Sequence, residues 1–294
     1  LEPTLQIIER TKILSSANKE SIICGWKFIK QRLNKFKTKF IPLDSEHFSI
    51  WSLIKNSNIK MISDIYLTAS GGPFFNQPIK KIKKANISDV IKHPSWIMGK
   101  KISVDSATMM NKIFELIEAS KIFNLNINKF KFIIHPSSYI HAIVNFKYGL
   151  TKFLLHETTM EIPIFNSIFN EYKKPDYYKI KKINFERLNG INFFNPKLKY
   201  YPYLNILKKI NKNDTYFEII LVTLNDELVK LFLKKKISFY KMQQVLIKLL
   251  KRKKLSKYYN KTPNNINDIN CMVEITRNYL KKTINEKYQN LHIN

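Results

Sequence analysis

The first 43 residues alternate between helix-like and strand-like segments, and this alternation constrains the fold more than any other feature of the sequence. Pro3 suits the first turn of a helix, after which a short apolar strand is expected. Residues 21–33 have the spacing of an amphipathic helix, and residues 39–43 resemble a strand that ends at Asp44. Because such alternation is typical of α/β folds, we predict that residues 1–43 are the tail of an α/β domain.

Residues 44–170 hold most of the unusual polar motifs, and their apolar pattern predicts an α+β catalytic domain. Ser106 stands before a helical pattern over 107–123, where it would act as the N-cap. The expected strands cover 59–68, 130–134 and 143–146.

The remainder of the chain predicts a connecting segment followed by helices. Residues 171–200 are rich in Lys, Asn, Tyr and Pro, which is typical of a connection. Residues 201–294 predict a small helical domain, with helices over 224–235, 238–250 and 266–280. The expected fold class is therefore α/β with a C-terminal helical bundle.

The formal net charge of +29 would suit a nucleic-acid-binding protein, which is one alternative function. The lysines, however, are dispersed among Asn, Ile, Phe and Tyr, whose codons are AT-rich, and no recognised nucleic-acid-binding module is present. No apolar run approaches the roughly 20 residues that span a bilayer. We expect neither a nucleic-acid partner nor a membrane, although a positive field would attract a phosphorylated ligand.

The cysteines indicate the redox compartment, and the first residue and the glycines bear on the expected nucleotide-binding domain. Cys24 and Cys271 lack the spacing of metal ligands, which favours free thiols in a reducing compartment. The chain begins with Leu1, and its six glycines form no glycine-rich phosphate loop. We therefore expect a fragment that lacks most of a nucleotide-binding domain and is nearly inactive alone.

The motif Asp44-Ser45-Glu46 predicts a metal site. At the end of a strand, residues two apart share a face, so that both carboxylates would converge on one cation. Carboxylate oxygens suit Mg²⁺ and Mn²⁺. Alone the motif is weak, because a solvated acidic pair of this spacing is common.

The segment from Lys101 to Glu118 predicts a helix with polar chemistry on one face. A helix beginning near Ser106 would direct free N–H groups at an anion. Asn111, Glu115 and Glu118 share a face, with Lys112 one residue round. This combination suits a phosphorylated polyol beside a metal, whereas the simpler interpretation is an exposed helix with ordinary charge pairs.

Two loops add candidate ligand contacts. Ser70-Gly71-Gly72 follows a predicted strand and would allow the backbone to approach an oxyanion, although it can equally be a simple turn. The loop from His93 to Lys100 contains His93, Trp96 and Met98, a combination that fits a lid over a substrate.

Taken in order, these motifs resemble the 1-deoxy-D-xylulose 5-phosphate reductoisomerase family. The run from Gly99 to Lys112 is especially specific, and the resemblance weakens after about residue 150. The matching stretches are residues 17–21, 42–47, 68–74, 93–112, 115–119, 134–136 and 140–141.

The resemblance implies a role for each candidate residue. It implies that Asp44, Glu46 and Glu115 hold the metal, with Glu118 at the neighbouring acidic position. Ser45 would contact the substrate, and His93 and Trp96 would belong to the loop that closes over it. The substrate phosphate would be bound by Ser70, Ser106, Asn111 and Lys112. Residues near NADPH would be Asn18, Lys19, Glu20, Met98 and Met160.

The implied activity is the NADPH-dependent conversion of 1-deoxy-D-xylulose 5-phosphate to 2-C-methyl-D-erythritol 4-phosphate in the non-mevalonate isoprenoid pathway. The implied metal is Mn²⁺ or Mg²⁺, with Co²⁺ as a third option. Residues 1–43 would be the remnant of a Rossmann-like NADPH-binding domain. A homodimer is implied, in the cytoplasm of a bacterium such as an endosymbiont, with a plastid-type organelle as the other location.

Some residues depart from the family pattern. Ile113 stands where a glycine is usual and would crowd the cofactor or substrate. Residues 158–161 and 223–227 match the family only at Met160 and Glu227. The alternative function is therefore a degenerate, non-catalytic homologue that binds a phosphorylated ligand or only dimerises. The retained acidic set and the Asn111-Lys112 pair argue against it.

Overall fold

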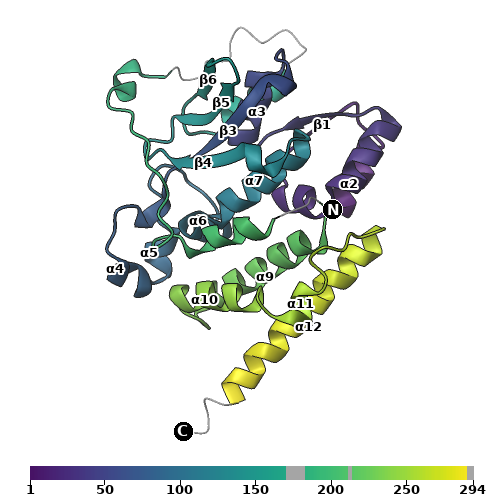
Figure 1. Ribbon diagram of the computed structural model, residues 1–294, viewed down its shortest axis with the longest axis vertical. Coiled ribbons are helices and arrows are strands. Elements are labelled where there is room, and N and C mark those ends of the chain that lie inside the picture. Colours follow the sequence, from purple (N-terminus) through teal and green to yellow (C-terminus); the bar gives the residue numbers. More distant parts are fainter. Residues whose placement is uncertain (170–182, 211–213, 290–294) are drawn as a thin grey trace.

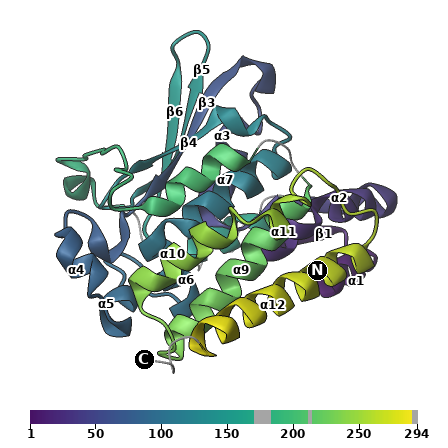
Figure 2. The ribbon, with the colours of Figure 1, turned by 60° about the horizontal axis from the view of Figure 1, so that its bottom comes forward.

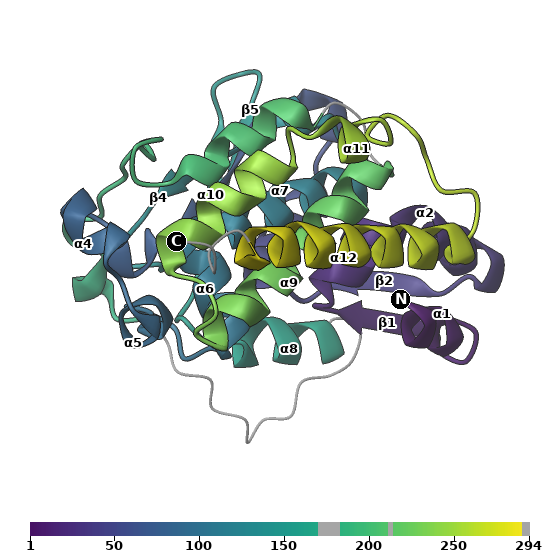
Figure 3. The same cartoon turned by 90° about the horizontal axis from the view of Figure 1, so that it is seen from below.

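The computed structural model describes residues 1–169, 183–210 and 214–289 of a mixed α/β protein. A four-stranded sheet lies on one side of the molecule and a layer of helices on the other, with α7 (Met110–Ile122) between them (Figure 1). The N-terminal segment forms a separate small α/β unit against one end of the helices (Figure 3). Residues 171–182 of the predicted connection 171–200 lie outside the described residues.

The N-terminal segment has the predicted order of helix, strand, helix and strand. These elements are α1 (Glu2–Ile8), β1 (Ile13–Ser16), α2 (Lys19–Phe36) and β2 (Lys39–Pro42). Strands β1 and β2 are parallel, as expected when a helix connects them. Asn18 caps α2 by accepting a hydrogen bond from the Ser21 amide. Lys37 ends α2 in the left-handed conformation.

The four-stranded sheet has the order β4-β3-β5-β6, and these strands comprise β3 (Ile62–Ala69), β4 (Phe130–Ile134), β5 (Ile140–Phe146) and β6 (Thr151–Leu155). Strand β4 has the predicted bounds, and β3 begins three residues later than predicted because Ile59–Met61 forms a 3-10 turn. Strand β6, which was not predicted, forms a hairpin with β5 (Figure 2). Helix α3 (Ser45–Ile54) packs against this sheet beside α7.

The predicted single helix over 107–123 is wrong, because the chain forms two helices there. Helix α6 (Lys100–Thr108) follows Gly99 as its N-cap, and α7 (Met110–Ile122) begins after Met109. Met109 has φ 64°, a left-handed conformation that ends α6 and re-aims the chain. Ser106 therefore lies in the last turn of α6, and it caps no helix.

Nearly every side chain of α7 is buried, including those of two lysines and two glutamates. The helix contacts the sheet on one side and the C-terminal helices on the other, so no face of it is left for solvent (Figure 1). Burial of charge is costly unless the charges are paired. The Lys121 ammonium shows such pairing, since it contacts the carboxylates of Asp214 and Glu218 at 2.8 Å each.

The C-terminal part is helical, as predicted, and completes the main apolar core. Helices α9 (Tyr216–Leu233) and α12 (Ile266–Gln289) pack along one another, and α10 (Phe239–Leu249) packs on α9 (Figure 2). The further elements are α4 (Ile79–Lys83), α5 (Ile87–Ile91), α8 (Glu161–Ile168), the 3-10 segment Pro202–Lys209 and α11 (Lys253–Ser256). Among the described residues, no helix is long and apolar enough to cross a membrane.

Buried polar contacts tie α6 to α2 and α9. Asp105 on α6 accepts a hydrogen bond from the Asn225 amide at 2.7 Å, although Asn225 lies in a stretch that departs from the family pattern. Lys101 on α6 contacts Glu20 on α2 and lies 3.1 Å from the Asp226 carboxylate. These contacts fix the helices from which the functional residues project.

Candidate active site

A cavity of about 290 Å³ lies where the start of α3, the end of β3 and the loop before α6 meet the break between α6 and α7. Its wall includes most of the residues predicted to bind metal or substrate. These are Asp44, Ser45, Glu46, Ser70, His93, Ser106, Asn111, Lys112 and Glu115. Residues as far apart in the sequence as Asp44 and Glu115 therefore reach one site.

Three carboxylates converge at one end of this cavity, as predicted for a metal. Oxygens of Asp44, Glu46 and Glu115 all lie within 4.8 Å of one another. The predicted local geometry was wrong, however, because β2 ends at Pro42 and a helix begins at Ser45. Asp44 precedes the first turn of α3, and Glu46 lies within that turn, so a helix start rather than a strand face brings them together.

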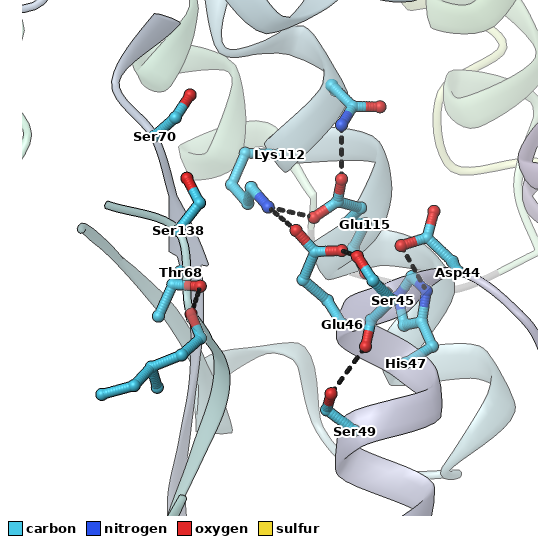
Figure 4. Close-up of polar contacts among 12 residues, drawn as sticks. Asp44, Ser45, Glu46, His47, Ser49, Thr68, Ser70, Lys112, Glu115 and Ser138 are labelled. Atoms are coloured by element: carbon cyan, nitrogen blue, oxygen red, sulfur yellow. Dashed lines mark hydrogen bonds and ion pairs between the residues drawn. The ribbon is translucent and has the colours of Figure 1, made fainter. Parts of the chain in front are cut away.

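Two buried lysines neutralise this acidic cluster. The Lys112 ammonium lies 2.6 Å from Glu46 and 2.5 Å from Glu115 (Figure 4). The Lys19 ammonium contacts Asp44 and lies 3.5 Å from Glu115. Burial would lower the pKa of both lysines, but the surrounding carboxylates raise it above its usual value, so both ammonium groups stay charged.

The two glutamates of the cluster differ in their affinity for protons. Burial raises the pKa of Glu115 to about 8, and the negative charge of Glu46 adds to this effect. Burial also opposes ionisation of Glu46, but Lys112 and the Ser45 hydroxyl hold its pKa well below the usual range. A divalent cation would relieve the unfavourable ionisation of Glu115, and the three carboxylates fit the oxygen ligands that Mg²⁺ and Mn²⁺ prefer.

The residues predicted to bind phosphate line the cavity, but two of them contact the acidic cluster. Asn111 donates to the Glu115 carboxylate at 2.5 Å, and Lys112 bridges Glu46 and Glu115. The hydroxyls of Ser70 and Ser138 lie on the opposite wall from Lys112 (Figure 4). The cavity thus has a carboxylate side and a hydroxyl side.

The Ser70 hydroxyl is oriented by His93. The backbone N–H groups of Ser95 and Trp96 donate to Nδ1 of His93, so the ring carries its proton on Nε2. The Nε2–H of His93 donates to Ser70 Oγ, with 2.9 Å between the nitrogen and the oxygen. The Gly72 amide donates to the same oxygen at 3.1 Å. Because both contacts use the oxygen as acceptor, the hydroxyl proton of Ser70 is left to donate to an anion.

His93 is therefore expected to be neutral, and its protonation should destabilise the protein. Burial and the Lys112 charge lower the pKa of His93 from 6.5 to about 4. A depressed pKa means that the unfolded chain binds the proton first, so the stability contributed by neutral His93 is lost as pH falls from about 6.5 towards 4. Thermal unfolding at several pH values should show a shallower acid loss for His93→Gln. Equal slopes for both proteins would contradict this.

The residues predicted near NADPH separate into two groups. Lys19, Met98 and Met160 line the cavity. Asn18 caps α2, and the Glu20 carboxylate contacts Lys101, so neither lies in the cavity wall. Trp96, predicted to belong to the closing loop, also lines the cavity.

Several residues of the site carried no predicted role. Ser138 and His141 line the cavity, and the His141 ring stacks on that of His156 at a centroid distance of 3.7 Å. The motif around His135 and His141 was visible in the sequence, but only the β5 hairpin shows which side chains reach the cavity. Ile113, expected to crowd a ligand, is instead fully buried in the apolar core and does not line the cavity.

The fold and the cavity define an α/β protein with a carboxylate-rich small-molecule site. Two family models match the chain: the 1-deoxy-D-xylulose 5-phosphate reductoisomerase C-terminal domain over residues 40–123, and the DXP reductoisomerase C-terminal domain over residues 155–279. The first of these segments contains all three clustered carboxylates.

Relatives of similar sequence carry the same family name. The chain is 52% identical over 270 residues to the 1-deoxy-D-xylulose 5-phosphate reductoisomerase of Pelagibacter ubique, covering 92% of this chain and 69% of that protein. It is 37% identical over 250 residues to that of Wolbachia pipientis wMel, covering 84% of this chain and 63% of the relative. The chain belongs to the 1-deoxy-D-xylulose 5-phosphate reductoisomerase family.

Solved structures agree with this assignment. The chain superposes on a DOX-P reductoisomerase in complex with NADPH, fosmidomycin and magnesium with a TM-score of 0.88 and 28% identity, over 98% of this chain and 74% of that one. A second match is the reductoisomerase from Zymomonas mobilis in complex with NADPH, with a TM-score of 0.82 and 28% identity, over 93% of this chain and 69% of that one.

Proposed function

We propose that this chain is the metal- and substrate-binding part of an NADPH-dependent reductoisomerase that converts 1-deoxy-D-xylulose 5-phosphate to 2-C-methyl-D-erythritol 4-phosphate. The observation that carries the proposal is the convergence of Asp44, Glu46 and Glu115 beside a hydroxyl-lined wall in one cavity. Its family supplies the reaction, and related structures contain NADPH, fosmidomycin and magnesium.

The carboxylate side would hold the divalent ion. Such an ion would supply Lewis-acid chemistry, polarising the ketone and hydroxyl oxygens of the substrate. Asp44, Glu46 and Glu115 fix its position, because α3 and α7 are both packed in the core. Lys112 is then free to exchange a carboxylate contact for an oxygen of the substrate.

The hydroxyl side would hold the phosphate. Ser70 offers an oriented proton, Ser106 and Ser138 add hydroxyls, and Asn111 offers an amide. Binding energy from a phosphate remote from the reacting carbons is available to close the loop around Trp96 and exclude water. This keeps the reacting end of the sugar at the carboxylates.

NADPH would supply the hydride. Lys19, Met98 and Met160 are the predicted cofactor residues in the cavity wall, and they support binding of only the end of the cofactor nearest the substrate. The parallel pair β1–β2 with its helices supports residues 1–43 as part of a Rossmann-like domain. Residues 44–170 would be the catalytic domain, 171–200 a connection and 201–294 a C-terminal helical domain.

A homodimer is part of the proposal, and β6 offers a surface for it. Within the described residues, β6 is the outer strand of the sheet, so its edge is available to pair with the same edge of a second copy. Leu150 and Phe153, beside and on this strand, have exposed apolar side chains, as do Ile164 and Ile168 on α8. Sedimentation equilibrium would measure the mass directly.

Calorimetry with this chain tests the proposed function without requiring turnover. We expect Mg²⁺ or Mn²⁺ to bind first and fosmidomycin to bind only when the metal is present. A chain that binds fosmidomycin equally well without metal would contradict a shared site. A folded chain that binds neither would instead support the non-catalytic alternative.

A further inference from the structure

A second group of potential metal ligands lies behind the first. Atoms of Asp44, His47 and Glu118 also lie within 4.8 Å of one another, and His47 and Glu118 are fully buried. Neither His47 nor Glu118 lines the cavity, so Asp44 alone links this group to the cavity wall. The proposed reaction assigns no role to His47.

The imidazole of His47 is held in the orientation of a metal ligand. Its Nε2–H donates to the backbone carbonyl of Glu115 at 2.9 Å, so the neutral ring has its lone pair on Nδ1. That Nδ1 faces Asp44 and Glu118, and Figure 4 shows it directed at Asp44. A backbone carbonyl that fixes the tautomer in this way is the usual support of a metal-binding histidine.

The buried polar atoms of this group face one another without the hydrogen bonds that buried polar atoms normally form. Within the described part of the chain, His47 Nδ1 and both carboxylate oxygens of Glu118 have no hydrogen-bond partner. His47 Nδ1 lies 3.5 Å from Glu118 and 3.7 Å from Asp44, beyond the range of a hydrogen bond. Ligands about 2.1 Å from one ion at tetrahedral angles are roughly 3.4 Å apart, so these separations suit a shared cation.

We propose that Asp44, His47 and Glu118 form a second cation site, selective for a first-row transition metal such as Co²⁺, Mn²⁺ or Zn²⁺ over Mg²⁺. The imidazole nitrogen accounts for the selectivity, because Mg²⁺ prefers oxygen ligands whereas these ions accept imidazole. The inference rests on the proposed function only in that Asp44 belongs to both groups.

Lys19 is the cation that competes for this site. Its ammonium contacts Oδ2 of Asp44 and lies 3.9 Å from Glu118, while Oδ1 of Asp44 faces His47. A metal ion in the second site would be repelled by this ammonium and would have to displace it. Removal of the ammonium should therefore strengthen transition-metal binding.

The test isolates the second site by disabling the first. Glu46→Gln removes a ligand of the first site and leaves the three residues of the second site, Asp44, His47 and Glu118, unchanged. In this variant we expect Mg²⁺ affinity to collapse while one Co²⁺ still binds, with imidazole in its ligand shell by X-ray absorption. Adding His47→Gln, which can keep the donor to the Glu115 carbonyl, should lower Co²⁺ affinity more than about tenfold. Adding Lys19→Met to Glu46→Gln instead should raise Co²⁺ affinity.

The outcomes separate this inference from the proposed function. The second cation site is overturned if Glu46→Gln loses Co²⁺ binding as completely as Mg²⁺ binding, or if adding His47→Gln leaves Co²⁺ affinity unchanged. Circular dichroism and Mg²⁺ binding by the His47→Gln single variant check that the chain folds. Should that variant not fold, Glu118→Gln takes its place with the same expected loss. Failure of the unaltered chain to bind Mg²⁺ and fosmidomycin would instead count against the proposed function.

Discussion

Replacing Glu115 with glutamine is expected to abolish binding of the catalytic metal while leaving the fold intact. Loss even of residues that only support metal ligands lowers affinity 10- to 100-fold, so loss of this ligand should cost more than about 100-fold in Mg²⁺ affinity. Glutamine resembles the protonated carboxyl that burial favours, since the pKa of Glu115 is raised to about 8. It can also still accept from Asn111, so the melting temperature should stay unchanged or rise.

Calorimetric Mg²⁺ titration and thermal unfolding of the same samples check this prediction. Glu227→Gln is a matched control, because Glu227 pairs with Lys230 and Arg277 on the helical side and does not line the cavity. It should leave Mg²⁺ affinity unchanged. Equal Mg²⁺ binding by Glu115→Gln and the unaltered chain would remove Glu115 from the metal site.

Replacing Lys112 with methionine is expected to weaken both folding and substrate binding. Removing one partner of a buried ion pair typically costs about 3–5 kcal/mol, because the remaining charge is uncompensated. Here Glu46 and Glu115 would face each other without the ammonium that lies within 2.6 Å of both. Saturating Mg²⁺ should restore part of the stability, since it binds the same carboxylates only in the folded state.

Urea unfolding with and without Mg²⁺ measures this effect, and fosmidomycin affinity measures the loss of binding. Lys131→Met is the control, because Lys131 pairs with Asp64 on the surface, where an ion pair contributes less than about 1 kcal/mol. A Lys112→Met chain as stable as this control would show that the buried pairing contributes little. Stability that Mg²⁺ fails to restore would separate Lys112 from the metal site.

The membership of the site was predictable from sequence because its residues occur in short motifs whose chemistry is recognisable. Asp44, Glu46, Glu115, Asn111 and Lys112 were all expected, and all line one cavity. The local geometry was not predictable to the same degree. A left-handed residue such as Met109 is rare, so the 3.6-residue pattern gave no sign that α6 ends there.

Contacts between distant segments were the other limit. Nothing in the local pattern distinguishes a lysine that borders a cofactor from one that neutralises a metal site, yet Lys19 contacts Asp44 across 25 residues. In the same way, Ile113 is one residue from Lys112 but points into the core, because α7 is buried on all sides. Such outcomes depend on how the helices pack, which motif spacing does not encode.

A crystal structure of this chain with Mn²⁺ and fosmidomycin tests the shared metal and substrate site most directly, because the anomalous signal of manganese places the ion. We expect an ion bound by carboxylate oxygens of Asp44, Glu46 and Glu115, with fosmidomycin between it and the Ser70 wall. An ion bound elsewhere, or fosmidomycin outside this cavity, would contradict the shared site.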